Sequence, residues 1–140
     1  MIYLDTSVVV PLLVPESKTA DVKAWFAGLD VSVVSSDWLL TEFASAVSIK
    51  LRRKELSESH ARAIREEFDL LTTAGLRIVP ISRKAYQNAA TLAAQHAHGL
   101  RAGDALHLAI ALEMGAQSMA TLDGVMTSNA QRLKLNVEVI

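Results

Sequence analysis

Four acidic side chains of this 140-residue sequence stand among apolar neighbours, although most of its 15 acidic residues lie in polar surroundings. Burying an ionised carboxylate costs several kcal/mol unless a cation or hydrogen bonds compensate it. A fold that accepts such residues therefore uses them for structure or for chemistry. The four are Asp5, Glu42, Asp104 and Asp123.

Asp5 and Asp123 each come directly after a short run typical of a β-strand. Asp5 follows Met1–Leu4, and Asp123 follows Ser118–Leu122, which reads SMATL. In an open parallel sheet, the carboxyl ends of the strands form the ligand-binding crevice. The structural alternative is that each of these residues only caps the helix that comes after it.

Glu42 and Asp104 fall on predicted helices. Glu42 lies inside a helix from Asp37 to about Arg53, and its neighbours three and four residues away are largely apolar. A Glu cannot cap a helix from its interior, so the alternative is a surface position at the edge of the buried stripe. Asp104 lies near the start of a helix over Ala102–Met114. Its alternative is compensation of the helix dipole, with Arg101 as an ion-pair partner.

The four carboxylates together favour a metal site. Two strand ends and two helices of one sheet sandwich can converge on one crevice, and clustered carboxylates stay ionised only beside a cation. Oxygen ligands without cysteine favour Mg²⁺ or Mn²⁺ over Zn²⁺. We therefore expect Asp5 and Asp104 to be the principal ligands, with Glu42 and Asp123 binding directly or through water. Thr6, Ser7 and Thr121 are candidates to orient water or phosphate, or to act as caps.

The other polar motifs carry weaker signals. His96 and His98 are two residues apart at a helix end and face different ways, and no HExxH pattern includes His107, so a histidine-based metal site is disfavoured. The run KLRRK at Lys50–Lys54 is the densest basic patch, and a solvated last helical turn explains it at least as well as RNA binding does. Arg101 is the better candidate for a cation beside the acidic site.

Composition places the chain among ordinary globular proteins. Hydrophobic residues make up 51% and charged residues 21%, so there is material for a core within one domain, 1–140. The absence of cysteine excludes disulfides and is compatible with a reducing cytoplasm. No apolar stretch is long enough to span a bilayer, so we expect a soluble cytoplasmic protein. The net charge of −1 is not that of a basic nucleic-acid binder.

The sheet and helices that must position the four carboxylates can be placed from the pattern. Strands are expected at Met1–Leu4, Val31–Ser36, Leu76–Ile81, Ser118–Leu122 and Asn136–Ile140. Helices are expected between them, at 8–13, 18–27, 37–53, 57–73, 82–98, 102–114 and 123–133. Alternation of strands and helices predicts an α/β sandwich with a mostly parallel central sheet.

The same motifs resemble those of the PIN domain, and more narrowly of the VapC toxins of VapBC toxin–antitoxin pairs. The first two motifs of the family resemble LDTSVVVPLL, which contains Asp5, and SSDWLLTEFASAV, which contains Glu42. The third motif resembles LRAGDALHLAIALEMGA, which contains Asp104. The fourth motif resembles ATLDGVM, which contains Thr121 and Asp123. The resemblance covers the whole length. It implies a PIN-like three-layer α/β/α sandwich and a Mg²⁺- or Mn²⁺-dependent endoribonuclease. It also implies a homodimer and a small VapB-like antitoxin whose tail enters the active-site groove.

Three other functions remain as alternatives. A phosphoryl-acceptor signalling domain would show an adjacent acidic pair early in the chain, but Thr6 follows Asp5. A haloacid-dehalogenase-like phosphatase would carry a second Asp where Ser7 stands. A catalytically inactive PIN-like binding module is disfavoured because the acidic set is intact.

Overall fold

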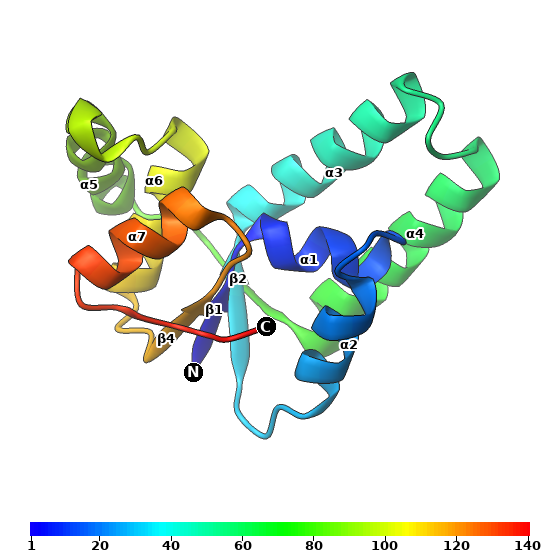
Figure 1. The fold of residues 1–140 in the computed structure, drawn as a ribbon, viewed down its shortest axis with the longest axis horizontal. Coiled ribbons are helices and arrows are strands. Elements are labelled where there is room, and N and C mark those ends of the chain that lie inside the picture. The colour runs from blue at the N-terminus through cyan, green and yellow to red at the C-terminus, as the bar shows by residue number, and fades with distance from the viewer.

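Five parallel strands form the centre of the computed structural model, which describes residues 1–140 (Figure 1). They are β1 (Ile2–Leu4), β2 (Val33–Ser36), β3 (Arg77–Val79), β4 (Ser118–Ala120) and β5 (Asn136–Val137), in the spatial order β3-β2-β1-β4-β5. Ile2 pairs with Val33 on one side and with Ser118 on the other. The chain therefore leaves the centre of the sheet in one direction through β2 and β3, and fills the other side with β4 and β5. In parallel sheets the crevice for ligands opens at such a switch point, here between β1 and β4.

Seven α-helices cover the sheet. They are α1 (Thr6–Leu13), α2 (Thr19–Ala27), α3 (Asp37–Arg52), α4 (Glu58–Leu70), α5 (Arg83–Ala94), α6 (Ala102–Glu113) and α7 (Gly124–Arg132). In Figure 1, α5, α6 and α7 lie on the left of the sheet, and α1, α2 and α4 lie on the right. The predicted α/β/α sandwich with its parallel sheet is confirmed. No helix is both long enough and apolar enough to cross a membrane.

The period-two alternation of β1 divides the core into two layers. Ile2 and Leu4 point into the layer under α1–α4, where Phe43 stacks on Phe68 with ring centroids 4.0 Å apart. Tyr3 points into the layer under α5–α7, and its side chain is fully buried. Each face of the sheet thus has its own apolar core, and Asp5 follows at the point where the two cores meet.

Several predicted boundaries were wrong. The helix expected to run from Ser82 to His98 ends at Ala94, and a separate 3-10 turn spans His96–His98. The carbonyl of His98 accepts a hydrogen bond from Asn129 Nδ2 of α7 and not from the next helical turn. Gly99 has a φ of 70°, the left-handed conformation that glycine adopts without strain, and it turns the chain into α6.

Other predicted helix and strand bounds differ from the structure by a few residues. The helix expected at 57–73 is α-helical only to Leu70, and Leu71–Gly75 form a π-helical turn. The last strand covers only Asn136–Val137. Thr6 and Ser7 were predicted to cap α1, but Asp5 is the N-cap residue and Thr6 is the first helical residue.

Candidate active site

All four sequence-selected carboxylates line one open pocket above the carboxyl end of the sheet. Asp5 follows β1, Glu42 comes from α3, Asp104 from the first turn of α6, and Asp123 from the start of α7. Thr6, Ser7, Ser45 and His107 complete the polar lining, and Ala46 and Ile49 contribute its apolar side. The pocket has a volume of about 280 Å³. Four segments that are far apart in the sequence therefore meet at this place.

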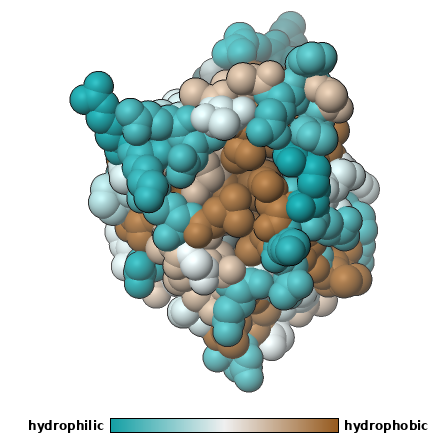
Figure 2. Space-filling view, turned by 90° about the vertical axis from the view of Figure 1, so that its left-hand side faces the viewer, coloured by the Kyte–Doolittle hydropathy of each residue, from teal (hydrophilic) through white to brown (hydrophobic).

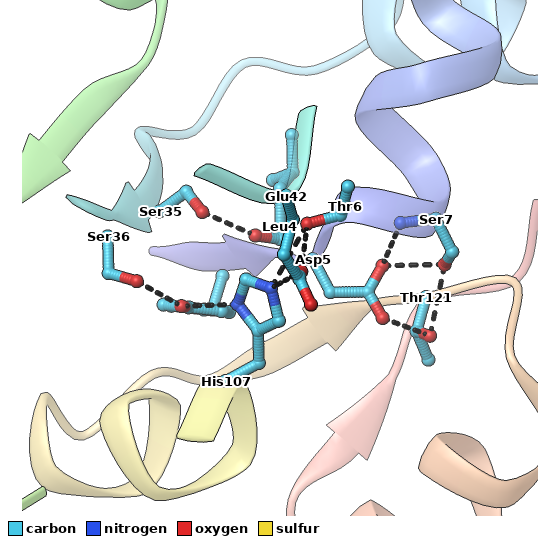
Figure 3. A network of polar contacts seen from close by, with 10 residues as sticks. Leu4, Asp5, Thr6, Ser7, Ser35, Ser36, Glu42, His107 and Thr121 are labelled. Atoms are coloured by element: carbon cyan, nitrogen blue, oxygen red, sulfur yellow. Dashed lines mark hydrogen bonds and ion pairs between the residues drawn. The ribbon is translucent and has the colours of Figure 1, made fainter. Parts of the chain in front are cut away.

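Asp5 is the most deeply buried of the four, with 3% of its surface exposed. Its Oδ1 accepts hydrogen bonds from Ser7 N at 2.9 Å and Ser7 Oγ at 2.6 Å, and its Oδ2 accepts one from Thr121 Oγ1 at 2.5 Å (Figure 3). Burial raises the pKa of Asp5, and the three hydrogen bonds oppose this shift. A carboxylate offers about four lone-pair sites, so three donors leave one site on Oδ2 for a further ligand.

Asp5 and Asp123 also serve as caps, as the structural alternative predicted. Asp5 accepts from the backbone of Ser7 at the start of α1, and Asp123 Oδ1 accepts from Met126 N at the start of α7 at 2.7 Å. Capping occupies one lone pair of one oxygen. The capping role and a place in the pocket are therefore compatible, and both residues have both.

Glu42 is held by two donors. Its Oε2 lies 2.7 Å from His107 Nε2 and 2.5 Å from Thr6 Oγ1, which donates to it. Burial by itself would raise the pKa of Glu42, but the hydrogen bonds from His107 and Thr6 outweigh burial, so the pKa lies below its usual range. The Trp38 indole N–H lies on the same side and lowers this pKa further, although it completes no hydrogen bond. The surroundings of Glu42 therefore favour its ionised form.

The pKa of Asp104 is shifted in the opposite direction to that of Glu42. Burial and the negative charges of Asp123 and Glu42 raise its pKa. No ion pair joins it to Arg101, whose side chain is exposed, so the alternative of a structural Asp104–Arg101 pair is wrong. Arg101 instead lines a second hollow, which shares Glu42, Asp104 and Asp123 with the first. Asp104 thus makes no ion pair with a basic side chain.

The four carboxylates line one pocket, but they are not arranged as a complete set of metal ligands. No group of three Asp, Glu or His side chains is arranged to hold an ion as it stands. Glu42 is turned toward His107, and Asp5 toward Ser7 and Thr121. The donor set nevertheless fits a hard divalent cation in its chemistry, because it consists of carboxylate oxygens.

Sequence reasoning missed His107. It lies three residues after Asp104 in an apolar run and is 2% exposed, so it was weighed only as a zinc ligand and disfavoured. His96 and His98 are exposed and take no part in the pocket. A signal for His107 was present, since a buried polar side chain between Leu106 and Leu108 needs a partner across the fold. The sequence did not reveal that partner.

The basic run at the end of α3 is partly neutralised. Lys50 Nζ lies 2.8 Å from Glu16 and 3.5 Å from Glu55, and the Glu16 hydrogen bond is the main reason that the pKa of Lys50 is raised. Arg52, Arg53 and Lys54 are exposed at the outer end of α3. A solvated helix end therefore accounts for this run.

Comparison with known proteins agrees with the fold and the pocket. The family model of the PIN domain matches residues 2–131. Ribonuclease VapC45 of Mycobacterium tuberculosis is 35% identical over 116 residues, which are 82% of this chain and 77% of that protein. The chain therefore belongs to the PIN-domain family, and within it to the VapC group.

Two solved structures show the same fold. The sarcin–ricin loop cleaving toxin VapC20 of Mycobacterium tuberculosis has a TM-score of 0.74 at 19% identity, over 92% of this chain and 95% of that one. VapBC2 of Rickettsia felis, bound to a DNA fragment from its promoter, has a TM-score of 0.65 at 21% identity, over 99% and 98% of the two chains. This similarity disfavours the phosphoryl-acceptor and haloacid-dehalogenase alternatives.

Proposed function

We propose that the chain is a VapC-type endoribonuclease toxin that hydrolyses RNA phosphodiester bonds with Mg²⁺ or Mn²⁺ in the four-carboxylate pocket. One observation carries this proposal: Asp5, Glu42, Asp104 and Asp123 come from four separate elements and line one open pocket at the switch point of the sheet. The 35% identical relative, which bears the name ribonuclease, supports RNA as the substrate.

The residues have separate tasks in this reaction. When bound, the divalent ion neutralises charge on the phosphate and makes water a stronger acid. Asp5 and Asp104 are the principal ligands, and Glu42 and Asp123 bind directly or through water. Glu42, which is kept ionised by its two donors, and Asp123 are placed to accept a proton from the attacking water. Arg101 lines the adjoining hollow and is placed to bind an RNA phosphate next to the cut.

RNA cleavage by the purified protein tests the proposal. Cleavage is expected with Mg²⁺ or Mn²⁺ and should stop with EDTA. Asp104→Asn and Asp5→Asn should each abolish it while the thermal unfolding transition stays cooperative. Asp69→Asn is the matched control, because Asp69 is exposed on α4, and this variant should cleave as the wild type does. Full activity of Asp104→Asn would refute the site, and no cleavage of any RNA would favour an inactive binding module.

A small VapB-like antitoxin is the expected inhibitor. The pocket presents four carboxylates and is lined by no Lys or Arg, so a tail that fills it must be basic. The similar Rickettsia felis structure contains a VapBC2 pair, which supports such a partner. Expression of the chain in the cytoplasm of its host should arrest the growth of the cells. Co-expression of the neighbouring small open reading frame should relieve the arrest. Persistent arrest would remove the antitoxin from the proposal.

A second copy of the chain is the expected occupant of an apolar hollow. Figure 2 shows a hydrophobic depression, rimmed by hydrophilic residues, on the side formed by α5 and α6. The pocket on this side is lined only by hydrophobic residues: Trp38, Tyr86, Ala89, Ala90, Ala93, Ala102 and Leu106. A basic antitoxin tail would be attracted by the charge of the acidic pocket. The apolar hollow carries no such charge, and two copies of the chain could bury this face against each other.

The mass in solution tests the homodimer. Light scattering should give about twice the chain mass of 15.2 kDa for the wild type. Ala90→Glu puts a charge into the apolar hollow and should give the monomer mass. Gln87→Glu, an exposed change on the same helix but outside the hollow, should leave the dimer intact. A monomeric wild type would show that this part is wrong.

A further inference from the structure

His107 is buried beside the four-carboxylate pocket. It lies on α6 in an otherwise apolar stretch, Ala105–Ala111, all of which is buried. A buried imidazole loses its hydration and must find partners for both ring nitrogens. Its contacts therefore show what the fold uses it for.

Both ring nitrogens are occupied by residues of other elements (Figure 3). Nε2 lies 2.7 Å from Glu42 Oε2 and 3.1 Å from Thr6 Oγ1. Nδ1 lies within hydrogen-bond distance of the Tyr3 hydroxyl, at 2.8 Å, and that hydroxyl donates its proton to Ser36 Oγ at 3.0 Å. The Tyr3 ring meets the imidazole edge to face, with centroids 5.7 Å apart. His107 is thus fixed by β1 on one side and reaches α3 on the other.

The direction of the hydrogen bond to Glu42 follows from its partners. An ionised carboxylate can only accept, so the proton between the two residues lies on Nε2, and His107 donates. Thr6 Oγ1 donates to the same oxygen. Glu42 Oε2 is therefore fully engaged, while no hydrogen bond is made to Oε1, which faces Gly103 at the start of α6.

We propose that His107 is a positioning residue, which holds Glu42 Oε2 through its Nε2–H and so presents Oε1 to the divalent cation. The inference rests on the proposed function, since it concerns the same pocket. A Glu side chain on a solvent-facing helix samples many rotamers, and fixing one of them before the ion arrives removes an entropic cost from binding. Tyr3, buried in the core, fixes His107 in turn. Outer partners of this kind commonly change metal affinity about 10–100-fold.

Mn²⁺ affinity, measured by calorimetry on the intact protein, tests the role apart from cleavage. His107→Leu should weaken Mn²⁺ binding about 10-fold. His107→Gln keeps an amide donor at nearly the place of Nε2 and should recover most of the affinity. If His107→Leu does not fold, Thr6→Val provides the second test, because it removes the other donor to Oε2 and should weaken binding several-fold.

A double-mutant cycle separates positioning from general damage. His107→Leu should have no further effect on Mn²⁺ affinity in a Glu42→Gln protein, because the group it positions no longer binds as a carboxylate. His60→Gln, an exposed histidine on α4, is the control and should bind Mn²⁺ as the wild type does. Unchanged affinity in His107→Leu, or the same loss with and without Glu42, would overturn the inference.

The failure of this inference is distinct from the failure of the proposed function. If Glu42→Gln does not alter Mn²⁺ affinity while Asp104→Asn abolishes both binding and cleavage, the metal site stands and the role of His107 falls. If Asp104→Asn binds Mn²⁺ and cleaves RNA normally, the site assignment itself falls, and this inference falls with it.

Discussion

Gly103→Ala should disable the pocket while leaving the fold almost intact. Gly103 precedes Asp104 in α6, and a Cβ there would stand 2.5 Å from Glu42 Oε1 and 3.1 Å from Trp38 Nε1. Non-bonded carbon and oxygen atoms settle near ~3.5 Å, so Oε1 must retreat by about 1 Å. Because Oε1 and Oε2 belong to one rigid carboxylate, we expect a shift of that size to misalign the 2.7 Å hydrogen bond between His107 Nε2 and Glu42 Oε2.

The expected losses of activity and of stability differ sharply. A misplacement of about 1 Å can cost roughly 100-fold in rate, and we expect RNA cleavage to fall by that order. Ala gains about 0.5–1 kcal/mol over Gly within a helix, against about 1.5–3 kcal/mol for the lost hydrogen bond to a charged group. Since Glu42 is partly exposed, the net loss should be about 1 kcal/mol, or roughly 2–5 °C in Tm.

Single-turnover cleavage and thermal unfolding of the same preparation measure the two effects. Gly28→Ala is the matched control, because Gly28 ends α2 at a φ of −86° and a Cβ there makes only ordinary contacts, the nearest at 3.5 Å. This control should keep full activity. Wild-type cleavage by Gly103→Ala would refute the reasoning, because it would show that the position of Glu42 does not matter.

Three further predictions follow from the charges and the core. Because the pKa of Asp104 is raised in the folded protein, its contribution to stability is present at acidic pH and is lost as pH rises through that pKa. Without metal, Asp104→Asn should therefore raise Tm at neutral pH and remove the stabilisation that Mn²⁺ gives the wild type; a lower Tm would contradict this. Arg101→Ala should weaken RNA binding and reduce its salt slope by about one, and Arg101→Lys should restore the slope, as filter binding at several salt concentrations will show. Phe43→Ala removes the ring stacked on Phe68 and should cost about 3–5 kcal/mol in urea unfolding; a loss below 1 kcal/mol would show that this core layer has collapsed around the gap.

The sequence by itself determined the kind of fold and which acidic residues to examine. Strand and helix periods are local, so each central strand and each helix was located from its own residues, with errors mainly at the ends. Asp5 and Glu42 were selected because a carboxylate among apolar neighbours needs a special reason. That argument requires only adjacent residues, and so the motif around each acid was sufficient to select it.

The tertiary structure decided which groups meet. Thr121 donates to Asp5 across 116 positions of sequence, and His107 holds Glu42 across 65. No periodicity links residues so far apart; only the strand order, with β1 between β2 and β4, brings them together. The close approach of Gly103 to Glu42 likewise arises from the packing of α6 on α3. The acidic residues could be selected from the sequence. The hydrogen bonds that orient their side chains exist only because separate elements pack at one end of the sheet.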